Sequence, residues 1–99
     1  MNEVGTARIL DGKATALAVR ADVAAGVEAL RAAGHPAPGL CVVLVGEDPA
    51  SQIYVRNKDR AATQAGFEVS TLNLGAETTQ ETLQAEIRRL NLDAGVHGI

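Results

Sequence analysis

Hydrophobic residues follow two different spacings along the chain, and these spacings predict alternating helices and strands. Between residues 11 and 34 apolar residues recur at helical intervals, with Asp11 as a start signal and Gly34 as a stop signal. The run 40–45 is short and rich in β-branched residues, and the run 67–74 alternates between two sets of side chains; both patterns are typical of strands. The first run is apolar at every position, so we expect a strand that is buried on both faces.

The residues after this first strand predict a second helix. Asp48 followed by Pro49 fits an N-cap with proline at the first helical position. The helix is expected to run from Pro49 to Ala65 and to end at Gly66. Before the first helix, residues 6–10 are expected to form a short extended piece.

A third helix is expected near the end of the chain. Thr78 and Glu81 have the spacing of a capping box, which marks a helix start. An apolar stripe follows and consists of Leu83, Ile87 and Leu90. Residues 96–99 are expected to begin a third strand.

The predicted order is therefore α-β-α-β-α-β, which places the chain in the α/β class. Short connections between alternating elements favour parallel strands with helical crossovers, so we expect a three-layer domain with a parallel sheet. The third strand is truncated almost where it begins, and an unfinished strand leaves a sheet edge unpaired. We therefore expect residues 1–99 to be an incomplete domain of a longer protein.

Composition and charge narrow the range of functions. The net charge is −3 and there is no Lys/Arg cluster, so nothing indicates nucleic-acid binding. No stretch is long and apolar enough for a signal peptide or a membrane span. The single cysteine, Cys41, lies in an apolar run, so we expect a buried, reduced thiol, consistent with a cytoplasmic protein. His35 and His97 are interpreted as structural residues, because no Cys/His/Asp spacing indicates a metal site.

The second helix carries the candidate chemistry, because ligands of open α/β sheets bind beyond the carboxyl ends of strands. At about 100° per residue, Ser51, Tyr54 and Lys58 share a face with small apolar residues. The other face is expected to lie in solvent and contains Gln52, Arg56, Asp59, Arg60 and Thr63. Lys58 has no carboxylate one helical turn away, so no local ion pair explains it.

Each of these three residues has a structural and a functional interpretation. Lys58 either lays its stem over small residues with its ammonium in water, or is desolvated and transfers protons. Tyr54 is either a packing residue or a flat platform for an aromatic ligand. Ser51 is either a first-turn helix residue or a ligand contact. Tyr-x-x-x-Lys also occurs in short-chain dehydrogenases, but the glycine-rich dinucleotide turn of those enzymes is missing, which excludes that reading here.

A longer match is more informative than this pair. The run "PGLCVVLVGEDPASQIYVRNKDRAATQAGFE" resembles the N-terminal catalytic domain of bifunctional methylenetetrahydrofolate dehydrogenase/methenyltetrahydrofolate cyclohydrolases of the FolD type. "ILDGKA" resembles the start of that family, and "TTQETLQAEIRRLN" followed by "VHGI" resembles its next helix and strand. The resemblance covers nearly the whole chain, and "VGEDPASQIYVRNK" is its most specific part.

The resemblance implies a role for each candidate residue. Lys58 would be the catalytic lysine, Tyr54 would stack on the folate, and Ser51 would lie near the substrate. The implied reactions of one-carbon metabolism are NADP-dependent oxidation of 5,10-methylenetetrahydrofolate and hydrolysis of the product to 10-formyltetrahydrofolate. The family continues with a Leu-Val-Gln-Leu-Pro segment and a Rossmann-like NADP domain, which this chain does not contain.

Two hypotheses follow. In the first, the chain is the incomplete folate-binding catalytic domain of a homodimeric enzyme and has little or no activity alone. In the second, the chain is a non-catalytic α/β binding or interaction module that uses the same helix as a protein-facing surface.

Overall fold

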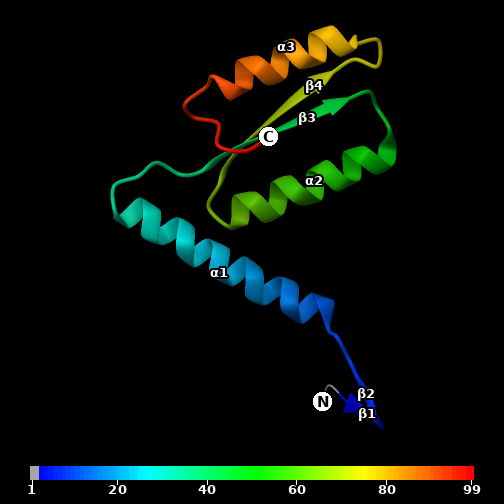
Figure 1. The fold of residues 1–99 in the computed structure, drawn as a ribbon, viewed down its shortest axis with the longest axis vertical. Helices are drawn as coiled ribbons and strands as arrows, with labels where there is room; N and C mark the ends of the chain where they lie inside the picture. Colours follow the sequence, from blue (N-terminus) through cyan, green and yellow to red (C-terminus); the bar gives the residue numbers. More distant parts are fainter. Residues whose placement is uncertain (1–2) are drawn as a thin grey trace.

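The computed structural model describes residues 3–99 and shows alternating helices and strands (Figure 1). In chain order the elements are β1 (Glu3–Val4), β2 (Ala7–Arg8), α1 (Gly12–Ala32), β3 (Gly39–Val45), α2 (Pro49–Gln64), β4 (Glu68–Leu74) and α3 (Gln80–Asn91). From α1 onward, these elements follow the expected order as far as α3. The α/β class predicted from the hydrophobic pattern is therefore confirmed.

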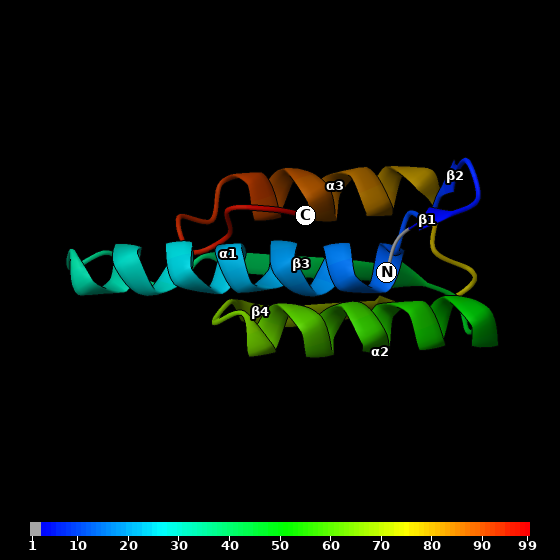
Figure 2. The ribbon, with the colours of Figure 1, turned by 90° about the horizontal axis from the view of Figure 1, so that it is seen from below.

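The central sheet consists of β3 and β4, which pair in parallel. The register runs from Gly39 opposite Glu68 to Val45 opposite Leu74, so the two strands pair along their whole length. Figure 2 shows α2 on one side of these strands and α3 on the other. This arrangement gives the three layers expected for parallel strands connected by helices.

Helix α1 lies outside this layered unit and reaches it mainly near its own C-terminal end. Its start is capped as expected, since the Asp11 side chain accepts a hydrogen bond from the Ala14 N–H. Val27 on α1 is buried, and a Cβ placed on Gly66 would lie only 2.9 Å from Val27 Cγ1. The absence of a side chain at Gly66 therefore lets α1 approach the turn between α2 and β4.

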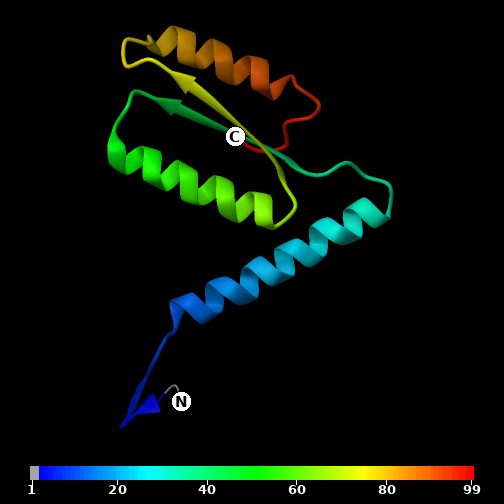
Figure 3. The ribbon, with the colours of Figure 1, turned by 180° about the vertical axis from the view of Figure 1, so that it is seen from behind.

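The N-terminal segment differs from the single extended piece that was expected. β1 and β2 form a short antiparallel hairpin around Gly5, which has a φ of 60°. Figures 1 and 3 show this hairpin beyond the first turn of α1, away from the sheet. A left-handed residue such as Gly5 allows the tight reversal, which an extended-strand pattern does not reveal.

The core formed by residues 3–99 is small. Its buried hydrophobic side chains are Val27, Cys41 and Leu90, and Cys41 has the free, buried thiol that was expected. The radius of gyration is 17.7 Å, whereas a compact domain of this size has one of about 13 Å. Leu17 on α1 is 60% exposed and Leu92 after α3 is 88% exposed. We therefore expect low stability for this chain by itself.

Helix α3 begins one residue later than the capping-box spacing indicated. Thr79, not Thr78, is the N-cap, and its hydroxyl oxygen accepts a hydrogen bond from the Thr82 N–H. Glu81 lies in the first turn as an acidic residue near the helix N-terminus. The sequence has two adjacent threonines at this point, and the structure uses the second as the cap.

The third strand and the burial of β3 also differ from the expectation. Residues 96–99 contribute a single parallel bridge, between Leu40 and Gly98, rather than a strand. Gly39 and Cys41 are the buried residues of β3, and Val45 at its end is 40% exposed. The edge of β3 opposite β4 is therefore covered near its start and left open toward Val45.

No helix within residues 3–99 is long and apolar enough to cross a membrane.

Candidate functional site

The turn after β3 brings the candidate helix to the carboxyl end of the sheet. Gly46 has a φ of 86°, which ends β3, and Asp48 then caps α2 with Pro49 in its first turn. Asp48 Oδ2 accepts hydrogen bonds from the Ser51 N–H at 3.1 Å and from the Ser51 hydroxyl at 2.9 Å. The Ser51 hydroxyl therefore stabilises the helix start, while its oxygen lone pairs can still accept a hydrogen bond.

A cavity of about 600 Å³ lies between β3, α2 and the end of the chain. Residues 40–44 of β3 form one wall, and Ile99 contributes from the segment after α3. The wall supplied by α2 includes Ser51, Tyr54, Val55 and Lys58. The structure thus brings together the three residues that the helical pattern had placed on one face.

Lys58 and Tyr54 contact each other at the mouth of this cavity. The Lys58 Nζ lies 5.3 Å from the centroid of the Tyr54 ring, which is within the range of a cation–π interaction. Both residues are exposed, and Tyr54 is 65% exposed. Of the two interpretations of Lys58, residues 3–99 therefore fit the one in which its ammonium stays in water, because Lys58 borders the cavity and is exposed.

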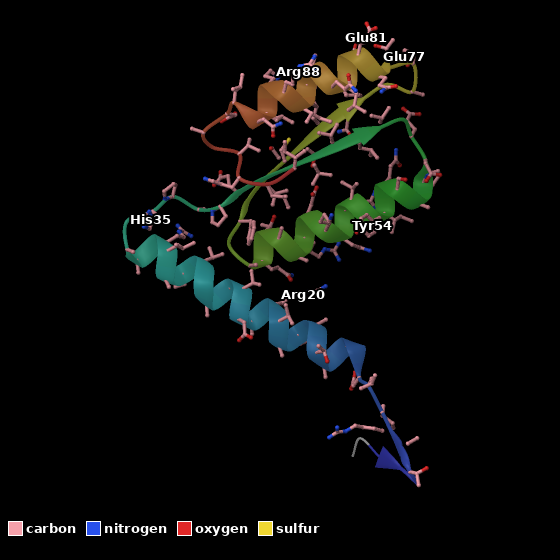
Figure 4. All side chains as sticks on the ribbon, viewed as in Figure 1. Arg20, His35, Tyr54, Glu77, Glu81 and Arg88 are labelled. Carbon is pink, nitrogen blue, oxygen red and sulfur yellow. The ribbon has the colours of Figure 1, made fainter. Side chains whose placement is uncertain are left out.

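A second cavity of about 580 Å³ lies on the other side of the same pair, between α1 and α2. Arg20 of α1 lines it together with Tyr54, Asn57 and Lys58 of α2. Figure 4 shows Arg20 extending from α1 toward α2, the helix that carries Tyr54. Two cations and two aromatic rings line this space and no carboxylate does, so its charge favours an anionic group. Sequence reasoning missed Arg20, because its position depends on how α1 packs.

The face of α2 that packs on the sheet is centred on Val55 and Asp59 rather than on Tyr54 and Lys58. Val55 and Asp59 are half-buried, and Asp59 Oδ2 accepts a hydrogen bond from the Thr71 hydroxyl of β4 at 3.0 Å. Asp59 Oδ1 is buried without a hydrogen-bond partner among the described residues. The assignment of Asp59 to the solvent face is therefore wrong. Tyr54 and Lys58 lie at the border of the buried face, which explains why they remain exposed.

These features define what the site can do chemically. An aromatic face and an ammonium group lie side by side above a mostly apolar cavity, which suits a flat ligand with an electrophilic or anionic part. The turn that precedes α2 carries Glu47 and Asp48, and Asp48 already accepts from the first-turn N–H of Ser51. This helix start is therefore a poor cradle for a pyrophosphate, so these residues do not fit a dinucleotide.

The chain matches known proteins along nearly its whole length. Residues 10–99 match the model of the family described as tetrahydrofolate dehydrogenase/cyclohydrolase, catalytic domain. The chain is 61% identical over 94 residues to the bifunctional protein FolD of Acidiphilium cryptum, and 52% identical over 99 residues to bifunctional protein FolD 3 of Ectopseudomonas mendocina. These matches cover 94% and 100% of this chain, respectively, and 32% of each relative. The chain thus spans about a third of the length of these curated relatives.

Solved structures show the same similarity in three dimensions. A 5,10-methylenetetrahydrofolate dehydrogenase from the silkworm, Bombyx mori, aligns with a TM-score of 0.87 at 41% identity, over 92% of this chain and 31% of that one. The methylenetetrahydrofolate dehydrogenase-cyclohydrolase of Trypanosoma brucei, solved with NADP cofactor and inhibitor, aligns with a TM-score of 0.84 at 35% identity. That alignment covers 95% of this chain and 32% of the other. The chain therefore belongs to the tetrahydrofolate dehydrogenase/cyclohydrolase family and corresponds to part of its catalytic domain.

Proposed function

We propose that residues 1–99 form the incomplete N-terminal, folate-binding part of a longer bifunctional enzyme. The longer protein oxidises 5,10-methylenetetrahydrofolate with NADP and hydrolyses the methenyl product to 10-formyltetrahydrofolate. The observation that carries this proposal is the shared cavity of Ser51, Tyr54 and Lys58 in a chain that belongs to this family.

Lys58 is proposed as the catalytic residue of the hydrolytic step. The methenyl carbon is electrophilic, so a neutral amine beside it can take a proton from an attacking water molecule. The resulting ammonium then returns the proton to the ring nitrogen as the carbon–nitrogen bond breaks. The Lys58 ammonium is exposed here, and within residues 3–99 its one contact is the Tyr54 ring, so a substrate that inserts beside that ring also removes water from the amine.

Tyr54 and Ser51 are proposed as substrate-binding residues. The Tyr54 ring is 65% exposed, so its face is available for stacking on the aromatic part of a folate. Ser51 lies one helical turn earlier on the same cavity wall, where its oxygen can accept a hydrogen bond from the substrate. These contacts hold the folate carbon in place, which is the main contribution a protein makes to hydride transfer.

The remaining parts of the proposal concern the longer protein. NADP, which accepts the hydride, is assigned to a separate Rossmann-like domain on the strength of the family resemblance. The first turn of α2 does not fit a dinucleotide, which agrees with this assignment. We propose a cytoplasmic homodimer that acts in one-carbon metabolism and in the supply of formyl groups for purine biosynthesis. The proposed function requires neither a nucleic acid nor a membrane as a partner.

The direct test is turnover by the full-length protein that contains these residues. Purified enzyme is incubated with 5,10-methylenetetrahydrofolate and NADP, and reduced cofactor and 10-formyltetrahydrofolate are both measured. We expect both products to form. A folded full-length protein that binds no folate and forms neither product would favour the alternative, a non-catalytic α/β binding or interaction module.

A further inference from the structure

The segment after α3 is attached to the start of β3 through His97. The Gly39 N–H donates a hydrogen bond to His97 Nδ1 at 2.8 Å, although the two residues are 58 positions apart in the sequence. In the opposite direction, the backbone N–H groups of His97 and Gly98 donate to the Gly39 carbonyl at 2.8 and 3.1 Å. Figures 1 and 3 show this segment returning from α3 to lie beside β3.

The chemistry of this contact requires a particular side chain. An imidazole nitrogen that accepts a hydrogen bond carries no proton, so the neutral ring has its proton on Nε2. Gly39 is buried, and an unpaired buried N–H group is costly. A Cβ on Gly39 would collide with the Gly95 carbonyl oxygen, so the backbone of the two segments is in close contact. The two segments thus form a junction in which glycine at position 39 permits the close approach and His97 accepts the hydrogen bond from the Gly39 N–H.

The residues that follow this junction reach the wall of the cavity that Tyr54 and Lys58 line. Beyond the junction, the Gly98 carbonyl accepts a hydrogen bond from the Cys41 N–H at 3.0 Å, and Gly98 bridges Leu40. The next residue, Ile99, lines the same cavity as Tyr54 and Lys58. Ile99 is the one lining residue of that cavity, among those in the described range, that lies outside β3 and α2.

We propose that His97 is a positioning residue for the substrate site. Its Nδ1 atom holds the Gly39 N–H and thereby fixes the chain direction that places Ile99 at the cavity wall, two residues later. The substrate involved is the folate of the proposed function, on which this inference rests. A positioning role of this kind affects how well the substrate fits, so it changes KM more than kcat.

The contact itself is tested first, by NMR on the isotope-labelled full-length protein. We expect a scalar coupling across the N–H···N hydrogen bond between Gly39 and His97, and slow exchange of the Gly39 amide proton. His97→Ala should accelerate that exchange about 10-fold or more, because a buried donor loses its partner. His97→Asn should restore slow exchange, because the Asn Oδ1 can occupy the place of Nδ1 and accept the same hydrogen bond.

Kinetics then test the positioning role in the same variants. His97→Ala should raise KM for 5,10-methylenetetrahydrofolate about 10-fold and change kcat by less than about 3-fold, while His97→Asn stays within about 3-fold of wild type in both. His35→Ala is the matched control, because His35 is the other histidine, lies in the loop before β3 and lines neither cavity. If His97→Ala does not fold, His97→Gln replaces it. The amide oxygen of Gln lies one bond further from the backbone than that of Asn, so it does not occupy the place of Nδ1.

The outcomes separate this inference from the proposed function. Fast Gly39 exchange with unchanged KM in His97→Ala would overturn the positioning role, as would failure of a folded His97→Asn to restore KM. Wild-type protein without folate turnover would instead contradict the proposed function. In that case amide exchange of Gly39 still tests the hydrogen bond between Gly39 and His97, while the proposed positioning role is rejected along with the proposed function.

Discussion

Replacing Lys58 with methionine should separate catalysis from stability. Methionine keeps an unbranched side chain with similar helix propensity but removes the amine. The structure shows one described interaction of the ammonium, the Tyr54 ring at 5.3 Å. A cation–π contact at an exposed site is worth about 0.5–1 kcal/mol, so Lys58→Met should lower the free energy of unfolding by about 1 kcal/mol or less.

The expected loss of activity is much larger. A positioned acid–base group contributes about 10²–10⁴-fold to a reaction rate. This range corresponds to about 3–5 kcal/mol of transition-state stabilisation, which is several times the stability effect. We therefore expect cyclohydrolase kcat to fall by at least about 100-fold in a protein that remains folded.

The assay follows the disappearance of the methenyl chromophore with the full-length protein, and urea denaturation of the same samples gives stability. Arg56→Met is the matched control, because Arg56 is an exposed cation on the same helix that lines neither cavity. It should retain activity within about 3-fold, as expected for a residue that does not touch the substrate. A fall of less than about 10-fold for Lys58→Met would refute the catalytic role, and an equal loss in Arg56→Met would indicate a general charge effect.

Four further outcomes are expected. Tyr54→Leu should raise KM for the folate about 3–10-fold with little change in kcat, because it removes a stacking surface; steady-state kinetics check this. Asp48→Ala should lower the free energy of unfolding by about 1 kcal/mol through loss of the α2 cap, whereas Asp48→Asn should cost only a few tenths, as measured by urea denaturation. Leu90→Ala, at a side chain only 5% exposed, should cost about 2–5 kcal/mol in the same measurement. The 99-residue chain alone should show neither activity; NADP-dependent oxidation by this chain would contradict the assignment of the NADP site to another domain.

Local signals in the sequence were sufficient for most of the secondary structure. Asp11, Asp48 and Pro49 mark helix starts through short-range hydrogen bonds and a fixed φ, and these effects act whatever the rest of the fold does. The apolar run of β3 likewise predicted its strand to within one residue. The one misplaced cap, at Thr79, arose where two adjacent residues of the same type could each serve.

The helical pattern also grouped Ser51, Tyr54 and Lys58 correctly, since residues three and four apart on a helix lie on one side. It did not predict which side of α2 faces the sheet. That orientation depends on contacts with β4, where Asp59 meets Thr71, and no periodicity within α2 contains this information. As a result, the pattern left open whether Lys58 is desolvated or keeps its ammonium in water, and the structure shows it exposed.

The sequence by itself thus determined the order of the elements, two of the three helix caps and the set of residues on the candidate face. Only the tertiary structure decided the exposure of Lys58, the contribution of Arg20 from α1, and the junction of His97 with Gly39. The physical reason is how far apart in the sequence the interacting residues lie. Caps and turns are governed by interactions within a few residues, whereas these three features join segments that are distant in the chain and meet only through packing.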